Sequence, residues 1–175
     1  MDTEDANAFT TGIGPSRKVF LWSSLLDGRF TNQEVEVVLA HEYGHQARNH
    51  LLRGIAWYAL FAFPGTFLIA LAAGRRGGMR QPAAMPLALL VLVVLNLVAL
   101  PFQNAISRHM EAEADWVALQ TTRDPAAMES LFRRFATTGL GDPSPPTAAY
   151  LAFKDHPTLM QRIAMARAWQ ARNAG

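Results

Sequence analysis

The sequence predicts a mainly α-helical protein that carries one small β-hairpin and an inserted hairpin of two transmembrane helices. Three observations support this fold class: strand-like segments near the N-terminus, a capped helix at about residues 32–50, and two long uncharged runs at residues 54–74 and 82–106. Hydrophobic residues make up 50% of the 175 positions, and the two runs hold most of the excess. A chain of this length forms one compact domain, or a small domain with membrane segments.

Two short segments near the N-terminus are typical of strands. Residues 8–11 and 18–22 are rich in aromatic, β-branched and threonine side chains, and the turn residues Gly12, Gly14 and Pro15 lie between them. We expect a β-hairpin beside the helix that follows. Its edge strand could bind an extended peptide by strand addition, and the alternative is a purely structural hairpin.

The next segment has the signals of a helix start. Thr31 followed by Glu34 is a capping box, and the apolar run at residues 35–40 continues the helix. Gly44 stands in the helix interior, where glycine costs about 1 kcal/mol relative to alanine. We therefore expect another segment of the chain to pack closely against the helix at this position.

This helix carries the pattern H-E-x-x-H as His41, Glu42 and His45, which arises by chance in about 0.6% of chains of this composition. Histidines four residues apart project from one face, so both can reach one Zn²⁺ while Glu42 acts on water as the catalytic base. Because the chain has no cysteine, any further ligand must be His, Asp or Glu. The pattern predicts a zincin-like metallopeptidase domain with one Zn²⁺ per chain; the alternative is a helix that happens to carry two exposed histidines.

Residues 54–74 and 82–106 hold no charged side chain, and each run can cross the roughly 30 Å hydrocarbon core of a bilayer. The alternative is two buried helices in a soluble protein, but so small a chain has little core in which to bury them on all sides. The loop at residues 75–80 is short, so residues before 54 and after 106 share one compartment. Arginines flank both ends of the spans in similar number, so charge alone does not set the orientation.

A group of acidic residues follows the second run, on a helix that we expect to continue out of the membrane. Glu111 and Asp115 are four residues apart and share a face, whereas Glu113 points roughly the opposite way. The simplest interpretation is that Glu111 binds zinc while Asp115 accepts the free N–H of a ligand histidine. The alternative is a solvated acidic helix face. His109 faces away from Glu111, and we expect it to be a residue at the membrane boundary that takes no part in the metal site.

Further helices are expected near residues 124–137 and 158–173, the second with helical apolar spacing typical of core packing. The whole pattern, in order, resembles the HtpX and CAAX prenyl endopeptidase family of integral-membrane zinc peptidases. The matching features are Asn7-Ala8-Phe9-Thr10-Thr11-Gly12, the His41 to His45 motif, two hydrophobic spans, Ser107-Arg108 with Glu111 and Asp115, and His156-Pro157 with Arg162-Ile163. Members of that family carry further membrane helices and a strand before the Asn-Ala-Phe segment, whereas this sequence starts almost at that segment.

The resemblance implies His41, His45 and Glu111 as zinc ligands, Glu42 as the base and Asp115 as the supporting carboxylate. It also implies that His156 approaches the substrate and stabilises the developing oxyanion. Without the resemblance, His156 would be a residue at the entrance of the helix that Pro157 opens.

We expect residues 1–53 to form the half of the peptidase domain with the zinc helix. Residues 54–106 then form the transmembrane hairpin, and residues 107–175 form the half of the peptidase domain with the third ligand.

The expected function is membrane-bound, zinc-dependent endoproteolysis of protein substrates. The alternative is a catalytically silent scaffold or zinc-binding protein with the same fold. The resemblance implies the cell inner membrane with a cytoplasmic active site. A net charge of +2 with scattered arginines does not indicate nucleic-acid binding.

Overall fold

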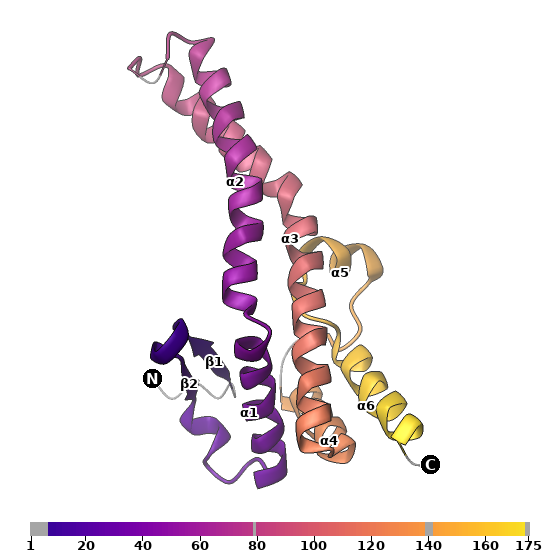
Figure 1. The fold of residues 1–175 in the computed structure, drawn as a ribbon. Helices are drawn as coiled ribbons and strands as arrows, with labels where there is room; N and C mark the ends of the chain where they lie inside the picture. The colour runs from indigo at the N-terminus through magenta and orange to yellow at the C-terminus, as the bar shows by residue number, and fades with distance from the viewer. Residues whose placement is uncertain (1–6, 79, 139–141, 174–175) are drawn as a thin grey trace.

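The computed structural model of the protein describes residues 7–78, 80–138 and 142–173. Two long helices rise as an antiparallel pair from a base that holds the other helices and a β-hairpin (Figure 1). The strands and α-helices in chain order are β1 (Ala8–Thr11), β2 (Lys18–Leu21), α1 (Asn32–Ala47), α2 (His50–Gly74), α3 (Ala84–Thr122), α4 (Pro125–Thr138), α5 (Thr147–Phe153) and α6 (Leu159–Asn173), with short 3-10 helices at Gly14–Ser16 and Ser23–Leu25. The predicted mainly helical fold class with a small β-hairpin is confirmed.

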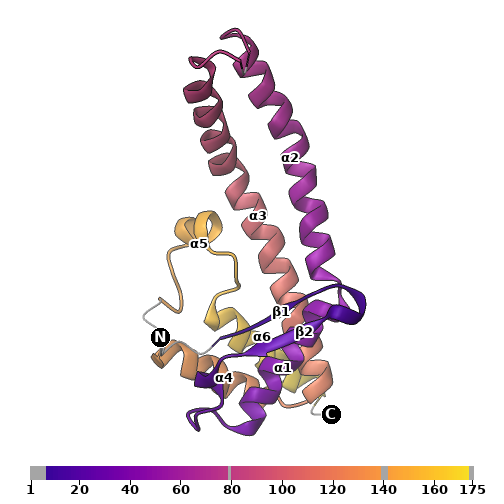
Figure 2. The ribbon, with the colours of Figure 1, turned by 90° about the vertical axis from the view of Figure 1, so that its left-hand side faces the viewer.

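The β-hairpin forms where the sequence predicts it. Ala8 pairs with Leu21 and Thr11 with Lys18 in an antiparallel register. The turn between the strands requires glycine at position 12, because φ is +88° and a Cβ there would lie 2.2 Å from the carbonyl oxygen of Ser16. The hairpin lies against α1 beside the base of α2 (Figure 2).

The capping box at the start of α1 is present. The amide of Glu34 donates to Thr31 Oγ1 at 3.2 Å, and the amide of Thr31 donates to Glu34 Oε2 at 2.8 Å. The helix ends at Ala47, three residues earlier than predicted, because Asn49 adopts a left-handed conformation with φ of 52°. The chain changes direction there and α2 begins at His50.

The two apolar runs form helices whose sides are exposed. In the most apolar 18-residue window of α2 none of the residues is buried, and in that of α3 only 6% are. Both helices are long and apolar enough to cross a membrane, and the alternative of two helices buried in a soluble core is wrong. With 39 residues, α3 is about 58 Å long, nearly twice the hydrocarbon thickness of a bilayer. Its C-terminal part therefore belongs to the base.

The base has one hydrophobic core between α1, α3, α4 and α6. Its most buried large side chains are Leu25, Val37, Leu119, Met128, Leu131 and Phe132. Gly44 lies where α1 meets α3, and a Cβ at this position would be 3.1 Å from both the Cα and the carbonyl oxygen of Ala114. The predicted close approach at Gly44 is confirmed, and α3 is the partner.

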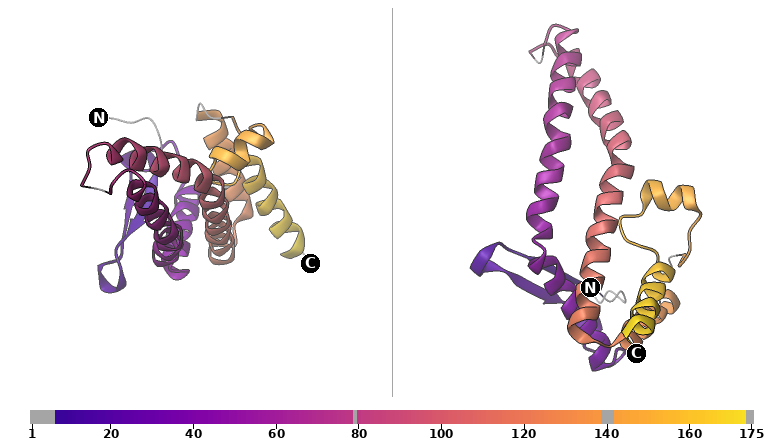
Figure 3. Two further views of the ribbon diagram at one scale, coloured as in Figure 1. Left: turned by 90° about the horizontal axis from the view of Figure 1, so that it is seen from above. Right: turned by 45° about the vertical axis from the view of Figure 1, so that its right-hand side comes forward.

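The C-terminal helices α4 and α6 match the prediction closely, but α5 was not predicted. It lies on the side of α3 opposite α2 (Figure 3). Asn104 Nδ2 donates to the carbonyl of Ala152 at 2.8 Å, and the guanidinium of Arg108 lies 4.8 Å from the centre of the Tyr150 ring. These contacts hold the end of α5 on α3 and lead residues 154–156 toward the first part of α6.

Candidate metal centre

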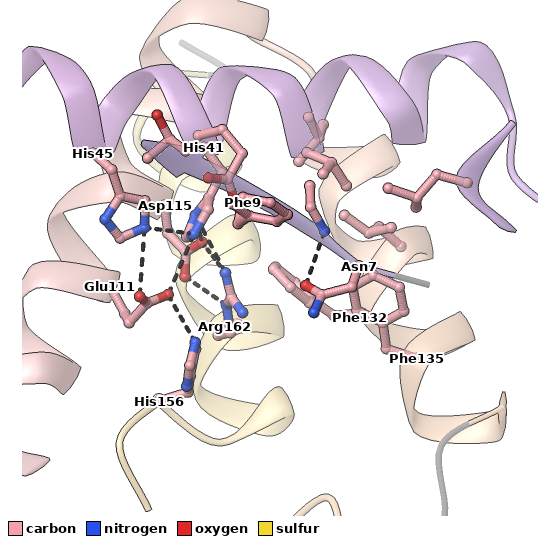
Figure 4. Close-up of a pocket in the computed structure, with 17 residues that line it drawn as sticks. Asn7, Phe9, His41, His45, Glu111, Asp115, Phe132, Phe135, His156 and Arg162 are labelled. Atoms are coloured by element: carbon pink, nitrogen blue, oxygen red, sulfur yellow. Dashed lines mark hydrogen bonds and ion pairs between the residues drawn. The ribbon is translucent and has the colours of Figure 1, made fainter. Parts of the chain in front are cut away.

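The three sequence-predicted ligands meet at the contact between α1 and α3 (Figure 4). The Nε2 atoms of His41 and His45 are 3.0 Å apart. One carboxylate oxygen of Glu111 lies 3.3 Å from His41 Nε2, and the other lies 3.4 Å from His45 Nε2. One ligand atom from each residue lies within 4.8 Å of the other two, so the three side chains could hold a single metal ion.

The hydrogen bonding of this cluster indicates that it suits a cation. Among the described residues, Glu111 Oε2 is buried and accepts no hydrogen bond. Buried polar atoms normally have a hydrogen bond, and in the described part of the chain this oxygen has only the His41 and His156 Nε2 atoms at 3.3 and 3.4 Å, an arrangement that suits a bound cation. Two nitrogens and a carboxylate oxygen form a ligand set that divalent zinc accepts, with a fourth position left open.

Asp115 lies beside the candidate ligand His41, where the sequence predicts it. Its Oδ1 atom lies 2.9 Å from Nδ1 of His41, which directs His41 Nε2 toward the cluster. Arg162 of α6 holds the same carboxylate: Nε donates to Oδ2 at 2.7 Å and Nη2 donates to Oδ1. The guanidinium also lies 4.1 Å from the centre of the Phe132 ring. Sequence reasoning assigned no role to Arg162, although it stands in the Arg162-Ile163 pair of the resemblance.

The electrostatics of the site favour positive charge at its centre. Burial lowers the pKa of His41, but the hydrogen bond to Asp115 and the nearby Glu111 carboxylate outweigh burial and raise this pKa to about 9. Burial and the neighbouring positive charge of His41 lower the pKa of His45 to about 4. Near neutral pH and without metal, His41 therefore carries the positive charge while His45 is neutral with a free ring nitrogen, so a metal ion that binds here must displace the proton from His41 Nε2.

Glu42 is buried one residue from His41 and lines the same cavity. Burial raises the pKa of its carboxyl group, the charge of His41 opposes this rise, and the charge of Glu111 adds to it. A carboxylate whose pKa lies above its usual range accepts a proton more readily, which suits a general base.

His156 reaches the cluster from the segment between α5 and α6. Its Nε2 atom lies 3.4 Å from Glu111 Oε2, and its Nδ1 atom lies 2.9 Å from Asp155 Oδ1. The side chain is 54% exposed, so a molecule in the cavity can contact it. His156 also lies just before the cap of α6, where the amide of Gln161 donates to Thr158 Oγ1 at 3.1 Å. The position of His156 therefore fits both expectations: contact with a substrate in the cavity, and a place at the entrance of α6.

The cluster opens into a cavity of about 340 Å³. One wall of the cavity is polar and consists of the cluster with Glu42, His156 and Arg162. A second wall is formed by residues 8–10 of β1. The remaining wall is apolar and consists of Leu25, Val37, Val38, Leu131, Phe132 and Phe135. The cavity therefore places a strand, an apolar wall and the candidate metal ligands around one space.

Two residues that sequence reasoning gave no role lie behind His45. His50 Nδ1 is 2.9 Å from His45 Nδ1, and His50 Nε2 is 3.1 Å from a carboxylate oxygen of Glu113. Glu113 does face away from Glu111, as predicted, but it faces α2 rather than solvent. No sequence signal marks this contact, because it depends on the change of direction at Asn49.

Comparisons with known proteins agree with this arrangement. The sequence matches the profile of Peptidase family M48 over residues 1–170. It is 32% identical to the uncharacterized metalloprotease YhfN of Bacillus subtilis, over 92% of this chain and 40% of that protein. It is 34% identical to a protease HtpX homolog of Campylobacter concisus, over 73% of this chain and 46% of that protein.

Among solved structures, the crystal structure of S. mikatae Ste24p shares the fold, with a TM-score of 0.77 and 22% identity. The match covers 91% of this chain and 41% of Ste24p. The chain thus spans less than half the length of each of these three proteins. The family profile covers nearly the whole chain, and the chain therefore belongs to peptidase family M48, as its resemblance to HtpX and the CAAX prenyl endopeptidases predicts.

Proposed function

We propose that this protein is a zinc-dependent endopeptidase that cleaves protein substrates at a membrane. The observation that carries the proposal is the convergence of His41, His45 and Glu111 beside the buried Glu42, in a cavity that a β-strand borders. Names of relatives such as protease HtpX homolog support the same activity. Retention of Glu42 argues against a catalytically silent scaffold, which would need no base.

His41, His45 and Glu111 would hold the ion, and zinc bound there supplies a Lewis acid that activates water and polarises the substrate carbonyl. Glu42 accepts the proton of the attacking water and then passes it to the leaving amine nitrogen. When both ring nitrogens of His156 are protonated, Nδ1–H donates to Asp155 and Nε2–H, directed into the cavity, donates a hydrogen bond to the developing oxyanion.

Asp115 and Arg162 act through His41. The Asp115 carboxylate holds His41 Nδ1–H, and Arg162 holds that carboxylate with two donors, so the imidazole keeps one orientation during the reaction. Arg162 also compensates the charge of Asp115, and the Glu111 carboxylate faces the ring nitrogens of His41, His45 and His156.

The position of β1 supports a proposal for how a substrate binds. One edge of β1 pairs with β2, and residues 8–10 line the cavity. An extended peptide that adds to the edge of β1 that pairs with no other described strand would present its backbone carbonyls toward His41 and Glu42. We further propose that the protein lies in the cell inner membrane with this site in the cytoplasm, which the resemblance implies.

The test uses the full chain purified in detergent, with zinc content and cleavage of casein or a membrane protein measured together. Wild-type protein is expected to hold one zinc ion per chain. Glu42→Gln should keep that ion and lose about 10²- to 10⁴-fold in cleavage rate, because the residue acts on water rather than on the metal. Glu36→Gln, an exposed change on the same helix, is the matched control.

Loss of metal together with activity in Glu42→Gln contradicts the role of this residue as base. Stoichiometric zinc without any cleavage by the wild-type protein supports the zinc-binding alternative instead of the peptidase.

A further inference from the structure

The second ligand histidine has a supporting chain of its own, separate from Asp115. Behind His45 lie His50, then Glu113, then Arg53, with distances of 2.9 Å, 3.1 Å and 2.5 Å between successive polar atoms. The His50 side chain is 4% exposed. A buried imidazole that contacts a candidate metal ligand on one side and a carboxylate on the other has the arrangement of a group that orients that ligand.

The change of direction between α1 and α2 creates this contact. On an uninterrupted helix, a residue five positions after His45 would lie about 140° around the axis and face away from it. Asn49, with φ of 52°, ends α1 and allows the first residue of α2 to turn back onto the last turn of α1. Arg17 Nη2 donates to Asn49 Oδ1 at 2.6 Å and ties this junction to the segment before β2.

Glu113 reaches the same place from α3. It lies two residues from Glu111, about 200° around the helix, so the two carboxylates serve different neighbours. Glu111 faces α1, and Glu113 faces the start of α2, where Arg53 donates to the carboxylate that also contacts His50.

One arrangement of protons gives every polar group in the series His45, His50, Glu113 and Arg53 a partner. If His45 offers the Nε2 lone pair to a metal ion, its Nδ1 carries the proton and donates to Nδ1 of His50. His50 then carries its own proton on Nε2 and donates to Glu113, which also accepts from Arg53. The reverse direction would leave His45 with a proton on Nε2 and unable to bind a metal ion.

We propose that His50 and Glu113 are positioning residues that hold His45 in the tautomer and orientation required of a metal ligand. This inference rests on the proposed zinc-dependent function. In this arrangement each ligand histidine is supported by its own carboxylate. Asp115 contacts His41 directly, and Glu113 supports His45 through His50. Groups of this kind commonly change metal affinity by about 10- to 100-fold when removed.

The test compares His50→Leu with His50→Asn in the full chain in detergent. Asn Oδ1 is attached to Cγ as His Nδ1 is, so His50→Asn keeps an acceptor for His45, whereas His50→Leu removes it. The zinc dissociation constant is measured by competition with a chelator. The visible absorption of the Co²⁺-loaded protein reports the ligand geometry independently of proteolysis. Circular dichroism checks the fold.

We expect His50→Leu to weaken zinc binding by about 10- to 100-fold and to change the Co²⁺ spectrum, with His50→Asn within about threefold of wild type. Glu113→Ala, at a side chain that is 29% exposed, should weaken zinc binding by about 3- to 10-fold without unfolding the protein. The exposed His109→Ala on the same helix is the matched control and should bind zinc as wild type does.

Wild-type zinc affinity in both His50→Leu and Glu113→Ala overturns the positioning role and leaves the peptidase proposal standing. Equal losses in folded His50→Asn and His50→Leu also overturn it, because they point to packing rather than to the acceptor. Absence of metal binding by the wild-type chain overturns both proposals together.

Discussion

A substitution at Gly44, where α1 contacts α3, tests whether helix packing sets the geometry of the candidate metal centre. In Gly44→Ala the new Cβ would lie 3.1 Å from two backbone atoms of Ala114, and backbone cannot rotate away as a side chain can. Overpacking of this kind costs about 1–3 kcal/mol. Alanine has a higher helix propensity than glycine, which stabilises the protein by about 1 kcal/mol, so the net loss in free energy of unfolding is about 0–2 kcal/mol.

The effect on function should exceed the effect on stability. His41 and His45 lie on α1 and Glu111 lies on α3, so a separation of the helices by a few tenths of an ångström spreads the three ligands. A displacement of about 1 Å in an active site can cost about 100-fold in rate, so a smaller shift should cost about 3- to 10-fold. Zinc affinity should fall in the same direction.

The assay measures thermal unfolding in detergent, zinc affinity and cleavage rate for Gly44→Ala and for Gly54→Ala. Gly54 is the matched control, because it lies in a helix and, apart from the neighbouring backbone of that helix, no described atom lies within 4 Å of the position a Cβ would take. Gly54→Ala should be neutral or stabilised by up to about 1 kcal/mol. If Gly44→Ala gains stability and keeps wild-type zinc affinity and rate, the close approach does not set the site geometry.

The proposed ligand set and the proposed membrane hairpin give three further tests. Glu111→Ala should lose stoichiometric zinc, and a full complement of zinc in that variant would exclude Glu111 as a ligand. Asp115→Asn should weaken zinc binding by about 10- to 100-fold, and unchanged affinity by chelator competition would count against its support of the metal site. Because the chain has no cysteine, a single introduced cysteine reports its own position. The hairpin predicts that a cysteine at Gly77 is labelled from one side of the membrane, and that cysteines at Asn32 and Thr122 are labelled from the other side. Labelling of all three from one side contradicts the hairpin.

The parts of the fold with local signals are predictable from the sequence. A capping box, a motif of two histidines four apart and two uncharged runs each depend on residues that are near neighbours in the chain. Their positions in α1, α2 and α3 differ from the prediction by a few residues. The meeting of Glu111 with the two histidines also follows, because a hairpin of two spans returns the chain to the helix it left.

The remaining features depend on packing between distant segments. Arg162 lies 47 residues from Asp115 in the chain, and its contact requires α6 to pack beside α3. His50 faces His45 only because Asn49 adopts a left-handed conformation, which helical periodicity does not indicate. The short α5 follows a Pro-rich segment that resembles a connector, and its contacts with Asn104 and Arg108 provide the stability that its length cannot.

The central claim is that two histidines of α1 and one glutamate of α3 hold one zinc ion beside Glu42. X-ray absorption at the zinc edge of the loaded protein tests it most directly, because scattering from imidazole rings counts histidine ligands. The account predicts two imidazole nitrogens and carboxylate or water oxygens at about 2.0–2.2 Å. Three imidazoles would contradict it, because His50 or His156 would then be a ligand rather than a neighbour.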